Sequence, residues 1–131
     1  GTIQNDDVTP TVQVTVSPMS VQEGGSQLLV YTFTRSNTQL NPLTINFAVG
    51  GGVNEATFGT DYTQTGARTF SATTGTVTFG YGKSTIIVSI RTITDLVPEP
   101  NESVTLKVVA GTGYDVGAID TAIGTVFDAL P

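Results

Sequence analysis

Acidic side chains in the loops are the groups in this sequence with the clearest chemistry. Cys and His are both absent, which removes thiolate chemistry, the usual general base near neutral pH and the commonest transition-metal ligand. Oxygen ligands remain, on carboxylates in or beside predicted turns: Glu23, Asp61, Asp95, Glu99, Glu102 and Asp128. If their loops share one end of the fold, the like charges repel, and a cation or bound protons must offset that repulsion.

Calcium is the cation that best fits such a set. Ca²⁺ accepts about six to eight oxygens in irregular geometry, including loop carbonyls, whereas Mg²⁺ demands a stricter octahedron and keeps more of its waters. An EF-hand would need its acidic residues inside one loop of about 12 residues, and no window of the sequence has that pattern. The carboxylates therefore predict a calcium site built from several separate loops.

Composition excludes several other classes of function. Lys and Arg number 5 against 11 Asp and Glu, a formal net charge of −6, so nucleic acid is not an expected partner. No apolar stretch approaches the roughly 20 residues that cross a bilayer, so no direct membrane insertion is expected. The number of carboxylates alone leaves a glycosidase conceivable. However, the chain has no Trp, and no set of acid, base and nucleophile can be named, so we expect no enzyme.

Runs of alternating apolar residues predict the strands that must position these loops. They cover residues 12–16, 29–33, 43–49, 77–79, 86–90, 104–108 and 123–127, with turn-forming Gly, Pro, Asn and Ser between them. About seven such strands favour an all-β, antiparallel two-sheet sandwich, and a closed barrel is the structural alternative. The aromatic residues in these runs are predicted to belong to the core: Tyr31, Phe33, Phe47 and Phe79.

Structural interpretations of single acids stay open beside the metal hypothesis. Residues 54–74 alternate weakly and are predicted to form a long loop or irregular edge outside the core. Glu23 could be a solvated turn residue, and Asp61 could accept hydrogen bonds from nearby backbone N–H groups. The remaining loop acids are predicted to be solvated charges: Glu55, Asp115 and Asp120.

Several short motifs, in their order along the chain, resemble the Calx-beta family. That family occurs in the regulatory loop of sodium/calcium exchangers, in an integrin beta subunit and in tandem bacterial surface proteins. The matching pieces are VQEG from Val21, ATFGTDY from Ala56, GTVTF from Gly75 with Gly82, the TDLVPEPNE stretch, and GTV from Gly124. Each motif is weak alone, but together they are specific.

The resemblance implies an immunoglobulin-like sandwich of about seven strands, with a calcium cluster at the tip where the last strand ends. By position, the implied metal ligands are Glu23, Asp61, Asp95, Glu99, Glu102 and Asp128. Glu102 matches either a ligand or a residue that orients the loop. Thr94 and Ala129 depart from the family pattern, which has further Asp residues at these places, so the resemblance implies fewer ions, one or two, bound more weakly.

A short internal similarity suggests how the modules are arranged. Residues 1–5, GTIQN, line up with residues 124–128, GTVFD. We therefore expect residues 1–7 to be the end of a preceding module and residues 8–131 to be one Calx-beta-like module of a tandem protein.

The expected function is a calcium-binding structural module, in which Ca²⁺ orders the loops at one end of the sandwich and stiffens the junctions between modules. The alternative is a calcium-independent spacer or adhesive module of a surface protein. Neighbouring modules of the same chain are the expected partners, with a protein partner in adhesion as a further one. An extracellular or cell-surface location is expected, and the resemblance leaves a cytoplasmic regulatory domain of a membrane transporter as its alternative.

Overall fold

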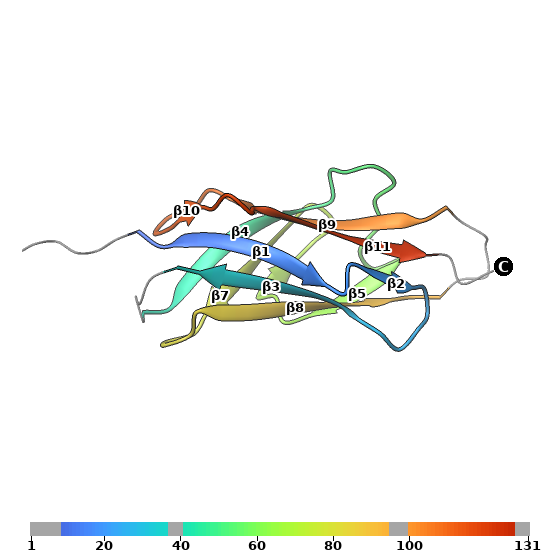
Figure 1. The fold of residues 1–131 in the computed structure, drawn as a ribbon, viewed down its shortest axis with the longest axis horizontal. Helices are drawn as coiled ribbons and strands as arrows, with labels where there is room; N and C mark the ends of the chain where they lie inside the picture. Colours follow the sequence, from blue (N-terminus) through green and yellow to red (C-terminus); the bar gives the residue numbers. More distant parts are fainter. Residues whose placement is uncertain (1–8, 37–40, 95–99, 128–131) are drawn as a thin grey trace, which may run out of the picture.

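The computed structural model describes residues 9–36, 41–94 and 100–127, which form two β-sheets packed face to face (Figure 1). The strands are β1 (Thr11–Ser17), β2 (Ser20–Gln22), β3 (Leu29–Arg35), β4 (Leu43–Val49), β5 (Tyr62–Thr65), β6 (Thr69–Phe70), β7 (Thr74–Phe79), β8 (Thr85–Thr92), β9 (Glu102–Val109), β10 (Asp115–Val116) and β11 (Thr121–Phe127). Within these three stretches no helix is long and apolar enough to cross a membrane. Residues 1–7 fall outside the described ranges, so the expected module boundary stays a prediction.

The two sheets have separate strand orders. One is β10-β1-β3-β8-β5 and the other is β2-β11-β9-β4-β7-β6. Neighbouring strands are antiparallel except for two short parallel pairs, β1 with β10 and β2 with β11. Each of the seven longest strands contains one of the seven predicted runs. The prediction of an all-β, immunoglobulin-like sandwich is thereby confirmed, and the closed barrel is wrong because the strands form two open sheets.

The core lies between the sheets and follows the alternation of each strand. In β3, the inward residues Leu29, Tyr31 and Phe33 are fully buried, while the residues between them are only half-buried or exposed. Each buried side chain of this size contributes about 1.5–3 kcal/mol to folding. The Tyr31 hydroxyl donates a hydrogen bond to the Val104 carbonyl of the opposite sheet. Burial raises the pKa of Tyr31 well above its usual range because the phenolate would lose its water.

The expectation that residues 54–74 lie outside the core is wrong in part. This segment forms β5 and β6, and Tyr62 is only 1% exposed. Phe58 and Phe70 pack with ring centroids 4.7 Å apart, and Phe70 also contacts the Phe47 ring at 5.7 Å. Aromatic packing against the sandwich therefore fixes a segment whose own alternation is weak.

A crossing from one sheet to the other sets up the acidic end of the molecule. The chain leaves the first sheet at Ser17 and enters the second at Ser20, where β2 pairs in parallel with the end of β11. The turn that follows β2 is thereby held beside the last residues of β11, and this turn carries Glu23.

Candidate functional site

The ends of strands from both sheets meet at one end of the sandwich, drawn at the right of Figure 1. β8 and β11 end here and β9 begins here, and the turn after β2 lies among them. β5 also begins here, because Tyr62 pairs with Thr92, the last residue of β8. Three of the predicted ligands stand at these strand ends, namely Glu23, Asp61 and Glu102. The structure thus brings them to one end, as convergence of the loops requires.

Glu23 is held against the last strand. Its backbone N–H donates a hydrogen bond of 2.8 Å to the Phe127 carbonyl. The residue is 6% exposed, which is unusual for a Glu. The interpretation of Glu23 as an ordinary solvated turn residue is therefore wrong. Burial of a carboxylate is costly unless hydrogen bonds or a cation offset the loss of water.

Asp61 has a structural role in addition to any metal contact. One carboxylate oxygen, Oδ2, accepts a hydrogen bond of 2.7 Å from the Thr57 N–H, and the Asp61 N–H donates to the Thr57 carbonyl at 2.8 Å. This confirms the structural interpretation that Asp61 accepts a hydrogen bond from a nearby backbone N–H, and its role as a metal ligand stays a prediction. The Asp61 carbonyl accepts from the Ile93 N–H at 2.8 Å, which places Asp61 beside the end of β8. Burial raises the pKa of neighbouring Tyr62, and the negative charges of Glu55 and Asp61 add to that effect.

Glu102 begins β9 and pairs with Val126 of β11, so it stands at the same end and is half-buried. The other predicted ligands lie outside the described residues: Asp95, Glu99 and Asp128. Within residues 9–36, 41–94 and 100–127, no group of three or more acidic side chains is close enough to hold a metal ion. The full ligand set therefore stays a prediction.

Glu55 is a structural carboxylate, and the prediction that it is a solvated charge is wrong. It was expected to be a solvated charge, but its Oε2 accepts a hydrogen bond of 2.6 Å from the Thr105 hydroxyl, and its Oε1 accepts from the Thr105 N–H at 3.2 Å. Thr105 is 6% exposed. The two residues are 50 positions apart, so no local pattern in the sequence could reveal the pair. Asp115, by contrast, is exposed as expected.

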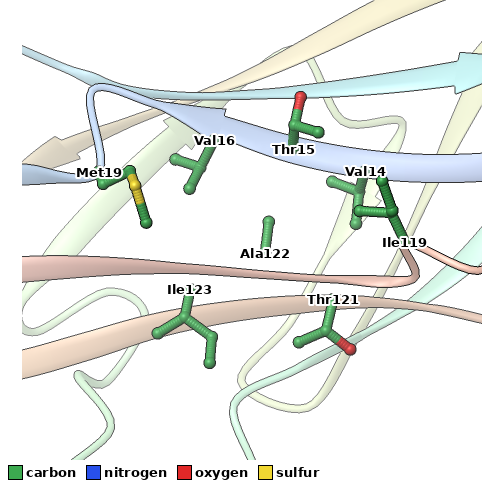
Figure 2. Close-up of a pocket in the computed structure, with 8 residues that line it drawn as sticks. All are labelled: Val14, Thr15, Val16, Met19, Ile119, Thr121, Ala122 and Ile123. Carbon is green, nitrogen blue, oxygen red and sulfur yellow. The ribbon is translucent and has the colours of Figure 1, made fainter.

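An apolar groove lies between β1 and β11 (Figure 2). Its volume is about 410 Å³, and β1 and β11 form its two walls. The lining residues are Val14, Thr15, Val16, Met19, Ile119, Thr121, Ala122 and Ile123. None of these lining residues is a carboxylate, so the groove offers no charged ligand for a cation.

Comparison with known proteins relates the fold to one group of solved structures. No family model matches the sequence, and no curated protein matches it. A crystal structure of the apo form of the Calx CBD1 domain superimposes with a TM-score of 0.63 at 15% identity, covering 92% of this chain and 99% of that one. Structures of CBD12 from CALX1.2 and of the calcium binding domain CBD12 of CALX1.1 give 0.63 at 18% identity.

The similarity to the CBD12 structures extends over most of this chain but over less than half of each CBD12 chain. The match takes in 88% of this chain but only 45% of each CBD12 chain, so this chain spans less than half of their length. At identities of 15% and 18% the likeness concerns the fold. It agrees with the sequence motifs that run from Val21 to Gly124 and confirms the resemblance at the level of structure. The chain has the Calx-beta fold.

Proposed function

We propose that this protein is a calcium-binding module whose site is the acidic end of the sandwich. The observation that carries the proposal is that Glu23, Asp61 and Glu102 all stand at one end of the sandwich, at strand ends contributed by both sheets. Among the structures with the same fold, one is described as a calcium binding domain.

The chemistry of these residues fits calcium. All the candidate side chains are carboxylates, which are hard oxygen ligands, and strand-end turns add backbone carbonyls that Ca²⁺ also accepts. Glu23 is almost fully buried, and a bound cation would offset part of the cost of that burial. In this proposal Glu23, Asp61 and Glu102 supply part of the ligand set from the described strand ends. Within the described residues they are not close enough to hold the ion by themselves, so the proposal needs further ligands.

Three further ligands would come from chain segments attached to the same end. Asp95 directly follows Thr94 in the sequence, and Asp128 directly follows Phe127. Phe127 is the last residue of β11, and Thr94 follows the end of β8 by two residues; both strands end at the acidic end. Asp95, Glu99 and Asp128 are therefore proposed as the remaining ligands. One or two ions is the proposed number, because Thr94 and Ala129 are neutral.

The bound ion would have a structural role. We propose no catalytic function for this protein. The ion would neutralise carboxylates that otherwise repel, order the loops between the two sheets, and stiffen the junctions with neighbouring modules of a tandem chain. Extracellular modules of this kind bind calcium at about 10⁻⁴ to 10⁻³ M. That range suits the proposed location outside the cell, where a protein partner in adhesion is also part of the proposal.

Thermal melting tests the proposal. Protein stripped with a chelator would be melted in EDTA, in CaCl₂ and in MgCl₂. At calcium concentrations about 100 times the dissociation constant, binding should add about 2.7 kcal/mol to the free energy of unfolding. Magnesium at the same concentration should add much less, because it fits an irregular site poorly. Identical melting curves in all three solutions would contradict the proposal.

The position of Thr94 supports a second candidate, a calcium-independent spacer or adhesive module. Thr94 stands where the Calx-beta pattern has a further acid, and its side chain packs against Gly24. A site with this neutral, packed residue has less negative charge to offset. Unchanged melting in calcium would favour this second function.

A further inference from the structure

A buried threonine at the end of β8 breaks the pattern of its strand. The inward positions of β8 hold Val88, Ile90 and Thr92, and the first two are fully buried and apolar. Thr92 is only 7% exposed. A Val of the same shape would continue the apolar pattern, whereas a buried hydroxyl is costly unless it forms a hydrogen bond. The hydroxyl of Thr92 must therefore have a polar partner.

That partner is the turn that carries Glu23. The Gly24 N–H donates a hydrogen bond of 2.8 Å to Thr92 Oγ1, across 68 positions of sequence. β8 belongs to the five-stranded sheet and β2, which precedes the turn, belongs to the six-stranded sheet. The bond therefore ties the two sheets together at the acidic end.

Gly24 allows this close contact. Its φ is +74°, a conformation that other residues adopt at a cost. A Cβ built on Gly24 would also overlap Thr94 Oγ1. The turn thus packs directly against the last described residues after β8, with no side chain between them.

The same short stretch contacts both halves of the proposed site. Thr92 holds the turn of Glu23, and the next residue, Ile93, donates its N–H to the Asp61 carbonyl at 2.8 Å. The separation between Glu23 and Asp61 therefore depends on how the end of β8 is attached to the turn. From this geometry we propose that Thr92 is a positioning residue of the calcium site, whose hydroxyl fixes Glu23 relative to Asp61. This inference rests on the proposed function.

Replacing Thr92 by Val tests the inference, because it removes the hydroxyl and keeps the shape. Calcium affinity, measured by isothermal titration, should fall about threefold to tenfold, the range expected for loss of one hydrogen bond. Thr92→Ser keeps the acceptor oxygen and should stay within about twofold of the parent protein, on the same reasoning. Thr85→Val is the matched control, because Thr85 is an exposed residue of the same strand. It should leave the affinity unchanged.

Hydrogen exchange of the Gly24 amide gives a readout in the unmodified protein. Saturating calcium should slow exchange at Gly24 more than at Arg35, whose N–H donates to the Ser84 carbonyl. In Thr92→Val the Gly24 amide should exchange faster than in the parent protein, both with and without calcium. A Gly24 exchange rate that calcium does not change in the parent protein would overturn the inference.

The outcomes separate this inference from the proposal beneath it. If the parent protein binds calcium and Thr92→Val binds equally well while melting earlier in EDTA, Thr92 is only structural and the inference is wrong. The calcium site would then stand. If the parent protein gives no saturable binding, the proposed function fails, and the inference fails with it.

Discussion

The two ends of the sandwich handle charge in opposite ways. At the end opposite Glu23, Asp61 and Glu102, Arg35 is 3% exposed. Its guanidinium donates hydrogen bonds to the carbonyls of Lys83, Asn41 and Gly80, at 2.7, 2.7 and 3.3 Å. It also lies 5.2 Å from the centre of the Phe79 ring. Here the cation is part of the chain, and carbonyl oxygens from three loop positions surround it.

At the other end the chain supplies acids in place of a cation. Glu23, Asp61 and Glu102 stand where the strands end, and the neutral bond from Gly24 to Thr92 is one tie between the sheets there. At one end of the fold the positive charge comes from the chain itself, through Arg35. At the other end we propose that it comes from a calcium ion taken from solution. Calcium should therefore not change the contribution of the Arg35 end to the free energy of unfolding. It should increase the contribution of the acidic end.

The largest effect is expected from Arg35→Met, which keeps much of the side chain's apolar length and removes its donors. Three carbonyls lose a charged partner, and the free energy of unfolding should fall by about 2 to 4 kcal/mol. Urea unfolding measures the change. Because Arg35 lies at the opposite end, the stability gained on adding calcium should be the same as in the parent protein.

Arg91→Met is the matched control, since Arg91 is an exposed residue of β8. Surface substitutions of this kind should change stability by less than about 0.5 kcal/mol. If calcium no longer stabilised Arg35→Met, the two ends would be coupled, and the expectation that they act independently would be wrong.

A smaller effect is expected from Glu55→Gln. The carboxylate of Glu55 accepts two hydrogen bonds from Thr105, and a Gln side chain has a single acceptor oxygen for both. Stability should fall by about 1 kcal/mol, measured by urea unfolding against Asp115→Asn, an exposed control. Glu55 serves the protein itself, so the stability gained from calcium should persist. If that gain disappeared, Glu55 would have to join the ligand set.

The long strands could be predicted from the sequence because local alternation specifies them. In β3 and β8 buried residues occupy every second position, and a one-residue shift would expose them. β9 departs from this pattern, because Thr105 is buried between Val104 and Leu106. The sequence did not predict four short strands, which are β2, β5, β6 and β10. With two to four residues each, they are held by pairing with a neighbour and not by their own pattern.

The candidate site could be predicted only in its residue types. The sequence indicated that Glu23 and Asp61 belong to one acidic group, and the structure places both at one end. It did not indicate the burial of Glu23, the bond from Gly24 to Thr92 or the pair of Glu55 with Thr105. Such contacts join residues about 50 to 70 positions apart, and they arise only when the two sheets pack.

Isothermal titration of chelator-stripped protein with CaCl₂ measures whether the acidic end binds calcium. The same titration is repeated with the double variant Asp95→Asn plus Glu99→Gln. We expect saturable binding in the parent protein, with a dissociation constant of about 10⁻⁴ to 10⁻³ M, and loss of that binding in the double variant. Absence of saturable heat in the parent protein at calcium concentrations of about ten times that range would contradict the account. The acidic end would then be held together by its own hydrogen bonds, and the protein would act as a calcium-independent module.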